Sequence, residues 1–265
     1  MKSTEILRES FRLLFQNIGT AILLSIIPVS ISAVIVFGFL NGVQMDIEEF
    51  AMGALMSIIL LPIAFAFSPS LILIIPVLLL VGCAAVYLWS WFAVAWHRKI
   101  LLDEPPTIRD LGSLRAAKRY CTKIIGFGLI YFGLGLLIII AFHDNLFLTE
   151  GRVGRYLLSN FVTIAQTYVG FRIALAFTSC ALGEDKSFGE SFSDTKHYNK
   201  EIFVLSLAMT SLSLILSFVS GHIASLSSTA NLGMSLVLVW FMLVLGLSAA
   251  SVLHREIVSH RTAIP

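Results

Sequence analysis

The chain has 265 residues, of which 57% are hydrophobic and 13% are charged, with a formal net charge of +2 and a mean hydropathy of +0.91. A soluble domain is nearer half apolar and about a quarter charged, so this composition leaves too little polar surface to face water and excludes an ordinary soluble protein. The net charge is small, and we expect no nucleic-acid partner.

The first predicted elements are an N-terminal amphipathic helix and a transmembrane helix that follows it. An apolar stripe recurs at helical spacing at Leu7, Phe11, Leu14, Phe15 and Ile18. The uncharged run at 18–40 is longer than the ~7–15 apolar residues of a signal peptide, and no small-x-small cleavage site follows it. A spanning helix needs about 20 residues and satisfies its own backbone in lipid, so this run is predicted to be a retained first span.

Five further apolar segments have the length of a spanning helix. They are 70–96, 124–142, 159–182, 202–221 and 233–253. With six spans, the cytoplasmic segments hold fifteen Lys and Arg residues and the outer loops hold two. Short cytoplasmic loops carry such an excess, so six spans with both termini in the cytoplasm is the predicted topology.

The segment 51–67 is apolar but short, and it contains Pro62. If it also crossed, the N-terminus and the most basic loop, 97–123, would lie on opposite sides, against the positive-inside rule. Whether it is re-entrant or lies along the interface stays open. The predicted fold class is therefore all-α: a polytopic bundle of six transmembrane helices plus cytoplasmic amphipathic helices, forming one integral membrane domain over 1–265.

Two cytoplasmic segments begin with a capping-box pattern. Thr107 is followed by Asp110, and Ser187 by Glu190. The hydroxyl accepts from a free backbone N–H and the acid reaches back to the cap, so helices are predicted to start at Thr107 and Ser187. The apolar positions behind them are Ile108, Leu111, Leu114, Ala117 and Cys121 in one, and Phe188, Phe192, Thr195 and Tyr198 in the other. Such helices suit a membrane surface with anionic headgroups; the alternative is that they only turn the chain between spans.

Arg172 is the most informative single residue. It lies roughly ten residues from the cytoplasmic end of 159–182, which is ~15 Å at the helical rise. An arginine near mid-membrane costs at least about 2.5–3.5 kcal/mol and needs a partner. Thr163, Gln166 and Gly170 lie near one face of this helix, and Arg172 lies off it.

Two interpretations of this segment stay open. In one, Arg172 and Gln166 belong to a polar seam that holds an anionic headgroup or a solute. In the other, Arg172 snorkels toward the cytoplasm or binds the C-terminal carbonyls of a helix. No acidic residue lies in any predicted span, which argues against a proton-coupled transporter.

Other candidate contacts lie at the ends of spans. His97 and Arg98 close the second span, Glu104 follows them, and Glu184 follows the fourth span. A headgroup site and simple interfacial anchoring both explain His97 and Arg98. In the fifth span, a stripe of small or hydroxyl residues favours helix packing, with a solute path as the alternative: Ser206, Thr210, Ser213, Ser217 and Gly221.

Signals for catalysis are missing from the sequence. It has no P-loop, dinucleotide-binding glycine motif, nucleophile elbow or paired-histidine zinc motif. Cys83, Cys121 and Cys180 are too scattered for a disulfide framework or a metal site. We therefore expect no catalytic residue, no metal and no cofactor, and predict that the protein is not an enzyme.

Short motifs after the second and fourth spans resemble those of a known family. Trp96-His97-Arg98 runs on to Glu104, and Leu182-Gly183-Glu184 precedes Glu190-Ser191-Phe192. They resemble a family of bacterial six-span inner-membrane proteins, distantly similar to the membrane domain attached to some glycerophosphodiester phosphodiesterases. Where members often carry a proline late in the fourth span, this chain has Ser179-Cys180. The resemblance implies six spans in a bacterial inner membrane and brings no activity with it; a soluble phosphodiesterase domain is not expected.

The sequence favours a non-catalytic membrane protein that binds lipid or a membrane-protein partner, including a second copy of itself. The alternative is a transporter or channel for a small or amphipathic solute. The candidate contact residues are Arg172, Gln166, His97, Arg98, Glu104 and Glu184.

Overall fold

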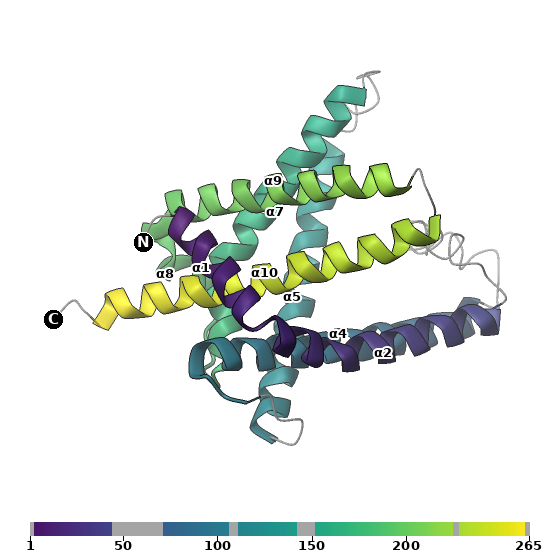
Figure 1. Cartoon of the computed structure of the whole chain (residues 1–265), viewed down its shortest axis with the longest axis horizontal. Coiled ribbons are helices and arrows are strands. Elements are labelled where there is room, and N and C mark those ends of the chain that lie inside the picture. The colour runs from purple at the N-terminus through teal and green to yellow at the C-terminus, as the bar shows by residue number, and fades with distance from the viewer. Residues whose placement is uncertain (1–2, 44–70, 106–110, 142–151, 225–227, 263–265) are drawn as a thin grey trace.

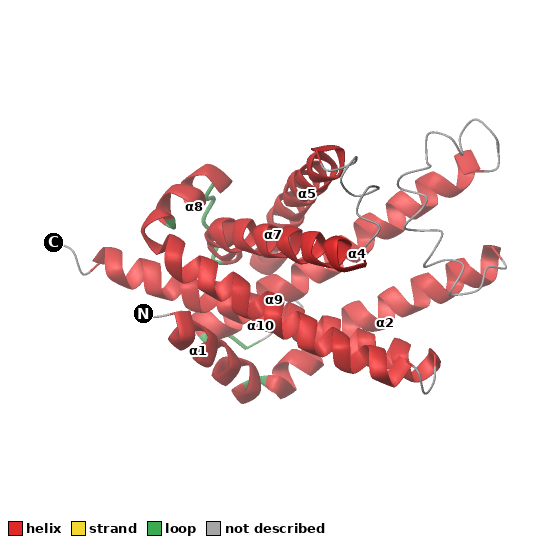
Figure 2. Cartoon of the chain, turned by 90° about the horizontal axis from the view of Figure 1, so that it is seen from above, coloured by secondary structure: helices red, strands yellow, loops and turns green. Residues whose placement is uncertain are grey.

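The structure, a computed structural model, describes residues 3–43, 71–105, 111–141, 152–224 and 228–262. Across these ranges every regular element is helical and no strand occurs, which confirms the all-α prediction for the described residues (Figure 2). The long helices are α2 (Ile18–Val43), α4 (Leu71–Leu102), α5 (Leu111–Ala141), α7 (Arg152–Ala181), α9 (Asn199–Ala224) and α10 (Ser228–Thr262). Each predicted span lies inside one of these helices or extends beyond one of its ends by a single residue.

Three segments in the described ranges are long and apolar enough to cross a membrane: Asn160–Ala181, Lys196–His222 and Gly233–Ser259. The pair formed by α1 (Ser3–Gln16) and the first half of α2 would be a fourth if its two bent parts count as one span. These segments mark the chain as a membrane protein by length and composition. The stretch 51–67 lies outside the described residues.

Helices α1 and α2 meet at a bend of 73°. Asn17 lies where α1 ends: its backbone N–H donates to the carbonyls of both Leu13 and Leu14, at 3.1 and 3.2 Å, and its side-chain Nδ2 donates to Leu13 at 3.0 Å. The Leu14 carbonyl, which the N–H of Ile18 would use in a continued helix, thus accepts from Asn17 instead, and the side chain adds a local bond of the kind that interrupts helices. As a result α1 turns away from the axis of α2 and lies across the ends of α9 and α10 (Figure 1).

The face that α1 buries differs from the one expected for a membrane-surface helix. Ile6, Ser10 and Leu14, spaced four residues apart, are fully buried, while Phe15 and Ile18 are exposed. Only part of the predicted apolar stripe is therefore buried: Leu14 packs against the rest of the protein, whereas Phe15 is exposed. The reason is tertiary, since the presence of α9 and α10 decides which side of α1 is covered.

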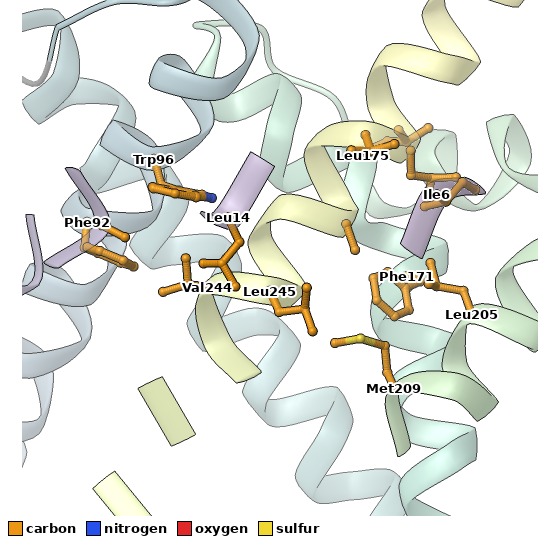
Figure 3. Close-up of a cluster of buried hydrophobic side chains, with 14 of the residues drawn as sticks. Ile6, Leu14, Phe92, Trp96, Phe171, Leu175, Leu205, Met209, Val244 and Leu245 are labelled. Atoms are coloured by element: carbon orange, nitrogen blue, oxygen red, sulfur yellow. The ribbon is translucent and has the colours of Figure 1, made fainter. Parts of the chain in front are cut away.

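Helix α10 is the centre of the bundle and contacts α1, α4, α7 and α9. The close-up of the core shows Val244 and Leu245 of α10 among side chains from the other helices, including Phe92 and Trp96 of α4 (Figure 3). Indole N–H groups tie two neighbours to it: Trp96 Nε1 donates to Ser248 Oγ at 3.1 Å, and Trp240 Nε1 donates to Ser25 Oγ of α2 at 2.6 Å. Small hydroxyl residues therefore serve helix packing here.

The short helix α8 (Phe188–Asp194) begins where the capping box predicts. Glu190 N–H donates to Ser187 Oγ at 3.2 Å, and Ser187 N–H donates to Glu190 Oε2 at 2.7 Å. A 3₁₀ turn, Lys196–Tyr198, joins α8 to α9. The start at Ser187 is confirmed, while the matching pattern at Thr107 and Asp110 lies outside the described residues.

Helices α5 and α7 run across the common direction of α2, α4, α9 and α10 (Figure 1). Both views place the N- and C-termini at the same end of the molecule, together with α8 (Figures 1 and 2). The crossing of α7 over α9 and α10 positions the cavity described next.

Candidate functional site

A cavity of about 480 Å³ lies between α5, α7, α9 and α10, with His97 of α4 at its edge. Its size falls within the roughly 300–1,000 Å³ of small-molecule sites. Most of the lining is apolar or aromatic and includes Phe127, Phe171, Phe177, Met209 and Met242. The cavity is therefore suited to an apolar chain rather than to a hydrated ion.

One face of α7 supplies much of the lining. Thr163, Gln166, Gly170, Ala174 and Phe177 recur every three or four residues and all face the cavity. The helical spacing predicts this face for Thr163, Gln166 and Gly170, and it predicts that Arg172 lies off it. The structure confirms both statements, since Arg172 is not among the lining residues.

Two buried polar side chains in the cavity wall lack hydrogen-bond partners within the described part of the chain. The Oγ1 atom of Thr210, on α9, is buried and makes no hydrogen bond. Gln166 is 8% exposed, and its amide is in no hydrogen bond with another described residue. The neighbouring Thr167 differs, because its hydroxyl donates to the carbonyl of Thr163 at 2.8 Å.

His97, Tyr120 and Ser251 form a buried polar chain at one end of the cavity. His97 Nδ1 lies 2.8 Å from Ser251 Oγ, and His97 Nε2 lies 3.3 Å from Tyr120 Oη. Because the Ser251 hydroxyl donates to the Leu247 carbonyl at 3.0 Å, it accepts from Nδ1–H of His97. A neutral imidazole with its proton on Nδ1 satisfies both contacts, with Nε2 accepting from the Tyr120 hydroxyl.

This burial of His97 differs from the interfacial position expected from the sequence. His97 is completely buried, because α4 continues to Leu102 and α5 and α10 cover the ring. Its contact with Ser251 is a histidine–serine pair, but Ser251 is fully buried and does not line the cavity. The pair therefore joins α4 to α10 and does not present a nucleophile to a substrate.

Arg172 connects α7 to the end of α8. Its Nη1 donates to the carbonyl of Thr195 at 3.1 Å, and its Nη2 donates to that of Phe192 at 2.6 Å. The guanidinium also lies 4.0 Å from the centroid of the Phe192 ring, a cation–π contact. In return, the hydroxyls of Ser191 and Thr195 donate to the Arg172 carbonyl at 2.9 and 3.1 Å.

This arrangement is the second of the two interpretations open from the sequence. A cation that binds carbonyls at the end of a helix satisfies groups that have no partner within the helix. With its side chain only 3% exposed, Arg172 is held by its own protein in a place apart from the cavity.

The remaining candidates lie elsewhere. Arg98 Nε donates to Glu104 Oε2 at 2.7 Å, so the structure brings these two together at the end of α4. Glu184 is exposed just beyond α7, where its backbone N–H donates to the Ser179 carbonyl at 2.9 Å across Gly183, whose φ is +92°. Of the six candidates only His97 and Gln166 line the cavity.

Sequence reasoning missed Tyr120, which lies in a segment whose basic residues suggest a membrane-surface helix. Tyr120 is 4% exposed and follows buried Ala116 and Ala117 by one helical turn. This three-to-four-residue spacing marks the face that α5 packs against α4 and α7. The same spacing in the sequence could have predicted that Tyr120 is buried.

Within the described ranges, no group of three or more His, Cys, Asp or Glu side chains could hold a metal ion. Neither a family model, nor a curated protein, nor a solved structure matched the chain. The resemblance to a bacterial inner-membrane family therefore stays a prediction.

Proposed function

We propose that this chain is a six-span protein of a bacterial inner membrane that binds a lipid, or another amphipathic membrane molecule, without catalysing a reaction. Each predicted span lies, to within one residue, inside a long helix of the described residues, and three of these helices contain segments long and apolar enough to cross a membrane. The positive-inside pattern and the shared end of the two termini support a cytoplasmic location for both.

The observation that carries the proposal is the cavity between α5, α7, α9 and α10. Pockets between helices of a bundle are common ligand sites, and an apolar wall with a few polar groups is their usual composition. The buried chain of His97, Tyr120 and Ser251 lies at one end.

The test compares two glycine substitutions on the full-length protein. A Cβ at Gly170 would meet Phe127 at 3.8 Å, so Gly170→Leu extends a side chain into the cavity without a backbone clash. The matched control is Gly128→Leu on exposed α5 surface, where a Cβ meets nothing within 4 Å.

Native mass spectrometry after gentle extraction provides the measurement. Lipid adducts are expected on the wild type. Gly170→Leu should carry at most about a tenth of the wild-type level, and Gly128→Leu should carry the same level as the wild type. No adduct on the wild type, or equal adducts on both variants, would contradict the proposal. A recurring protein adduct without lipid would instead indicate a membrane-protein partner.

A further inference from the structure

The cavity wall contains two buried hydrogen-bonding side chains that have no hydrogen-bond partner among the described residues. Gln166 and Thr210 come from different helices, α7 and α9, and both are more than nine-tenths buried. Buried polar groups nearly always have partners, and one left without a partner destabilises the fold. A ligand that enters the cavity can supply the missing partners.

Of the other polar groups in the wall, several are already engaged, while Ser213 and Tyr131 are partly or largely exposed. Thr167 donates to Thr163, and the two ring nitrogens of His97 contact Ser251 and Tyr120. Among the buried side chains of the wall, free hydrogen-bonding capacity is therefore found at Gln166 and Thr210, which offer an amide and a hydroxyl.

Among the described residues that line the cavity, none is Lys, Arg, Asp or Glu. Arg172, a cation of the same helix α7, is committed to the carbonyls of Thr195 and Phe192. A phosphate in this cavity would lose its hydration without gaining a counter-charge, which is strongly unfavourable. An uncharged polar group needs only the hydrogen bonds that Gln166 and Thr210 provide.

From these observations we infer that the cavity selects an amphiphile with an uncharged hydrogen-bonding group, such as a hydroxyl or an ester, over one with a phosphate headgroup. The inference rests on the proposed function and names the class of ligand. The volume indicates how much of the ligand enters. At about 480 Å³ it lies within the range of small-molecule sites, which indicates room for the apolar part of one small amphiphile.

The probes are a monoacylglycerol and a lysophosphatidylglycerol with the same acyl chain. Each is titrated against the full-length protein in detergent, and binding is measured by native mass spectrometry. The wild type is expected to bind the monoacylglycerol at least about tenfold more tightly, which corresponds to the loss of one or two hydrogen bonds and the desolvation of a charge.

Three variants test the two side chains. Gln166→Leu and Thr210→Val are each expected to weaken monoacylglycerol binding about three- to tenfold, the effect of one hydrogen bond, and to leave lysophosphatidylglycerol binding unchanged. Thr167→Val is the matched control, because its hydroxyl is already bonded to Thr163, and it should leave both affinities unchanged. Thermal unfolding of each variant without ligand checks that it folds.

The outcomes separate this inference from the proposed function. If neither probe binds the wild type, the proposed function fails. If both bind equally, or the phosphate probe binds more tightly, and Gly170→Leu abolishes binding, the proposed function stands and the inference is overturned. Equal effects of Thr210→Val and Thr167→Val on folded protein would also overturn it.

Discussion

Two polar regions lie on the same helix, α7, and they are built in opposite ways. At Arg172 the guanidinium contacts two carbonyls and an aromatic ring of the protein, and two hydroxyls donate to the Arg172 carbonyl. Only its buried Nε has no hydrogen-bond partner among the described residues. At Gln166 the amide faces a cavity and makes no hydrogen bond with a described residue. The comparison teaches that the charged residue serves the architecture, while the neutral one is left available for a ligand.

The largest effect is expected for Arg172→Met, which keeps the length of the side chain and removes its charge. Hydrogen bonds to charged groups contribute about 1.5–3 kcal/mol each, so the free energy of unfolding should fall by about 3 kcal/mol. Thermal unfolding in detergent measures this change. The control is Arg255→Met, an exposed partner of Glu9 for which the loss is below about 1 kcal/mol. If Arg172→Met kept full stability and lost its lipid adducts, the contrast between the two regions would be wrong.

A smaller loss is expected for Ser251→Ala at the buried polar chain. The substitution leaves the Nδ1–H of His97 without an acceptor in a buried position, which costs about 1–3 kcal/mol. Thermal unfolding again provides the measurement. The control is Ser211→Ala, on the exposed surface of the neighbouring helix α9, which should change little. If the Ser251→Ala protein were as stable as the wild type, the hydrogen bond between His97 and Ser251 would not contribute to stability.

A local effect is expected at α8 as the pH falls. Hydrogen bonds from the backbone and hydroxyl of Ser187 lower the pKa of Glu190 below its ordinary value. Since the folded pKa is the lower one, the cap's contribution is complete above the unfolded value of about 4.3 and is lost as pH falls through the folded value. The protection of the amides in 188–195 against hydrogen exchange, relative to the intrinsic exchange rate at the same pH, should therefore fall below about pH 4. In Glu190→Gln that pH dependence should disappear; its persistence would assign the effect to another group.

The smallest effect on stability is expected for Thr210→Val. Because the Thr210 hydroxyl has no partner in the described structure, its removal should leave the free energy of unfolding unchanged or raise it slightly, by at most about 1 kcal/mol. The unfolding temperature without ligand is the measurement, compared with Ser206→Ala one turn away, whose hydroxyl donates to Ile202. A clear loss of stability in Thr210→Val would show that this hydroxyl already has a structural partner.

Several features of this protein followed from local sequence alone. The helical segments are set by length and hydropathy, and the start of α8 by the spacing of Ser187 and Glu190, whose hydrogen bonds span only three residues. The separation of Gln166 from Arg172 follows from the turn of an α-helix, which places residues six apart on different faces. That a buried Arg172 needs a partner also follows from the cost of a desolvated charge.

Other features depended on contacts between residues far apart in the chain. The partners of Arg172 lie 20 and 23 residues away on the next helix, and those of His97 lie 23 and 154 residues away. No spacing rule within one helix reaches that far, so the burial of His97, the role of Tyr120 and the side of α1 that packs became evident only from the structure. The cavity also depends on contacts between distant parts of the chain. Helical periodicity determines which residues share a face of α7. Only the crossing of α7 over α9 and α10 decides that this face lines a cavity and does not pack against a neighbouring helix.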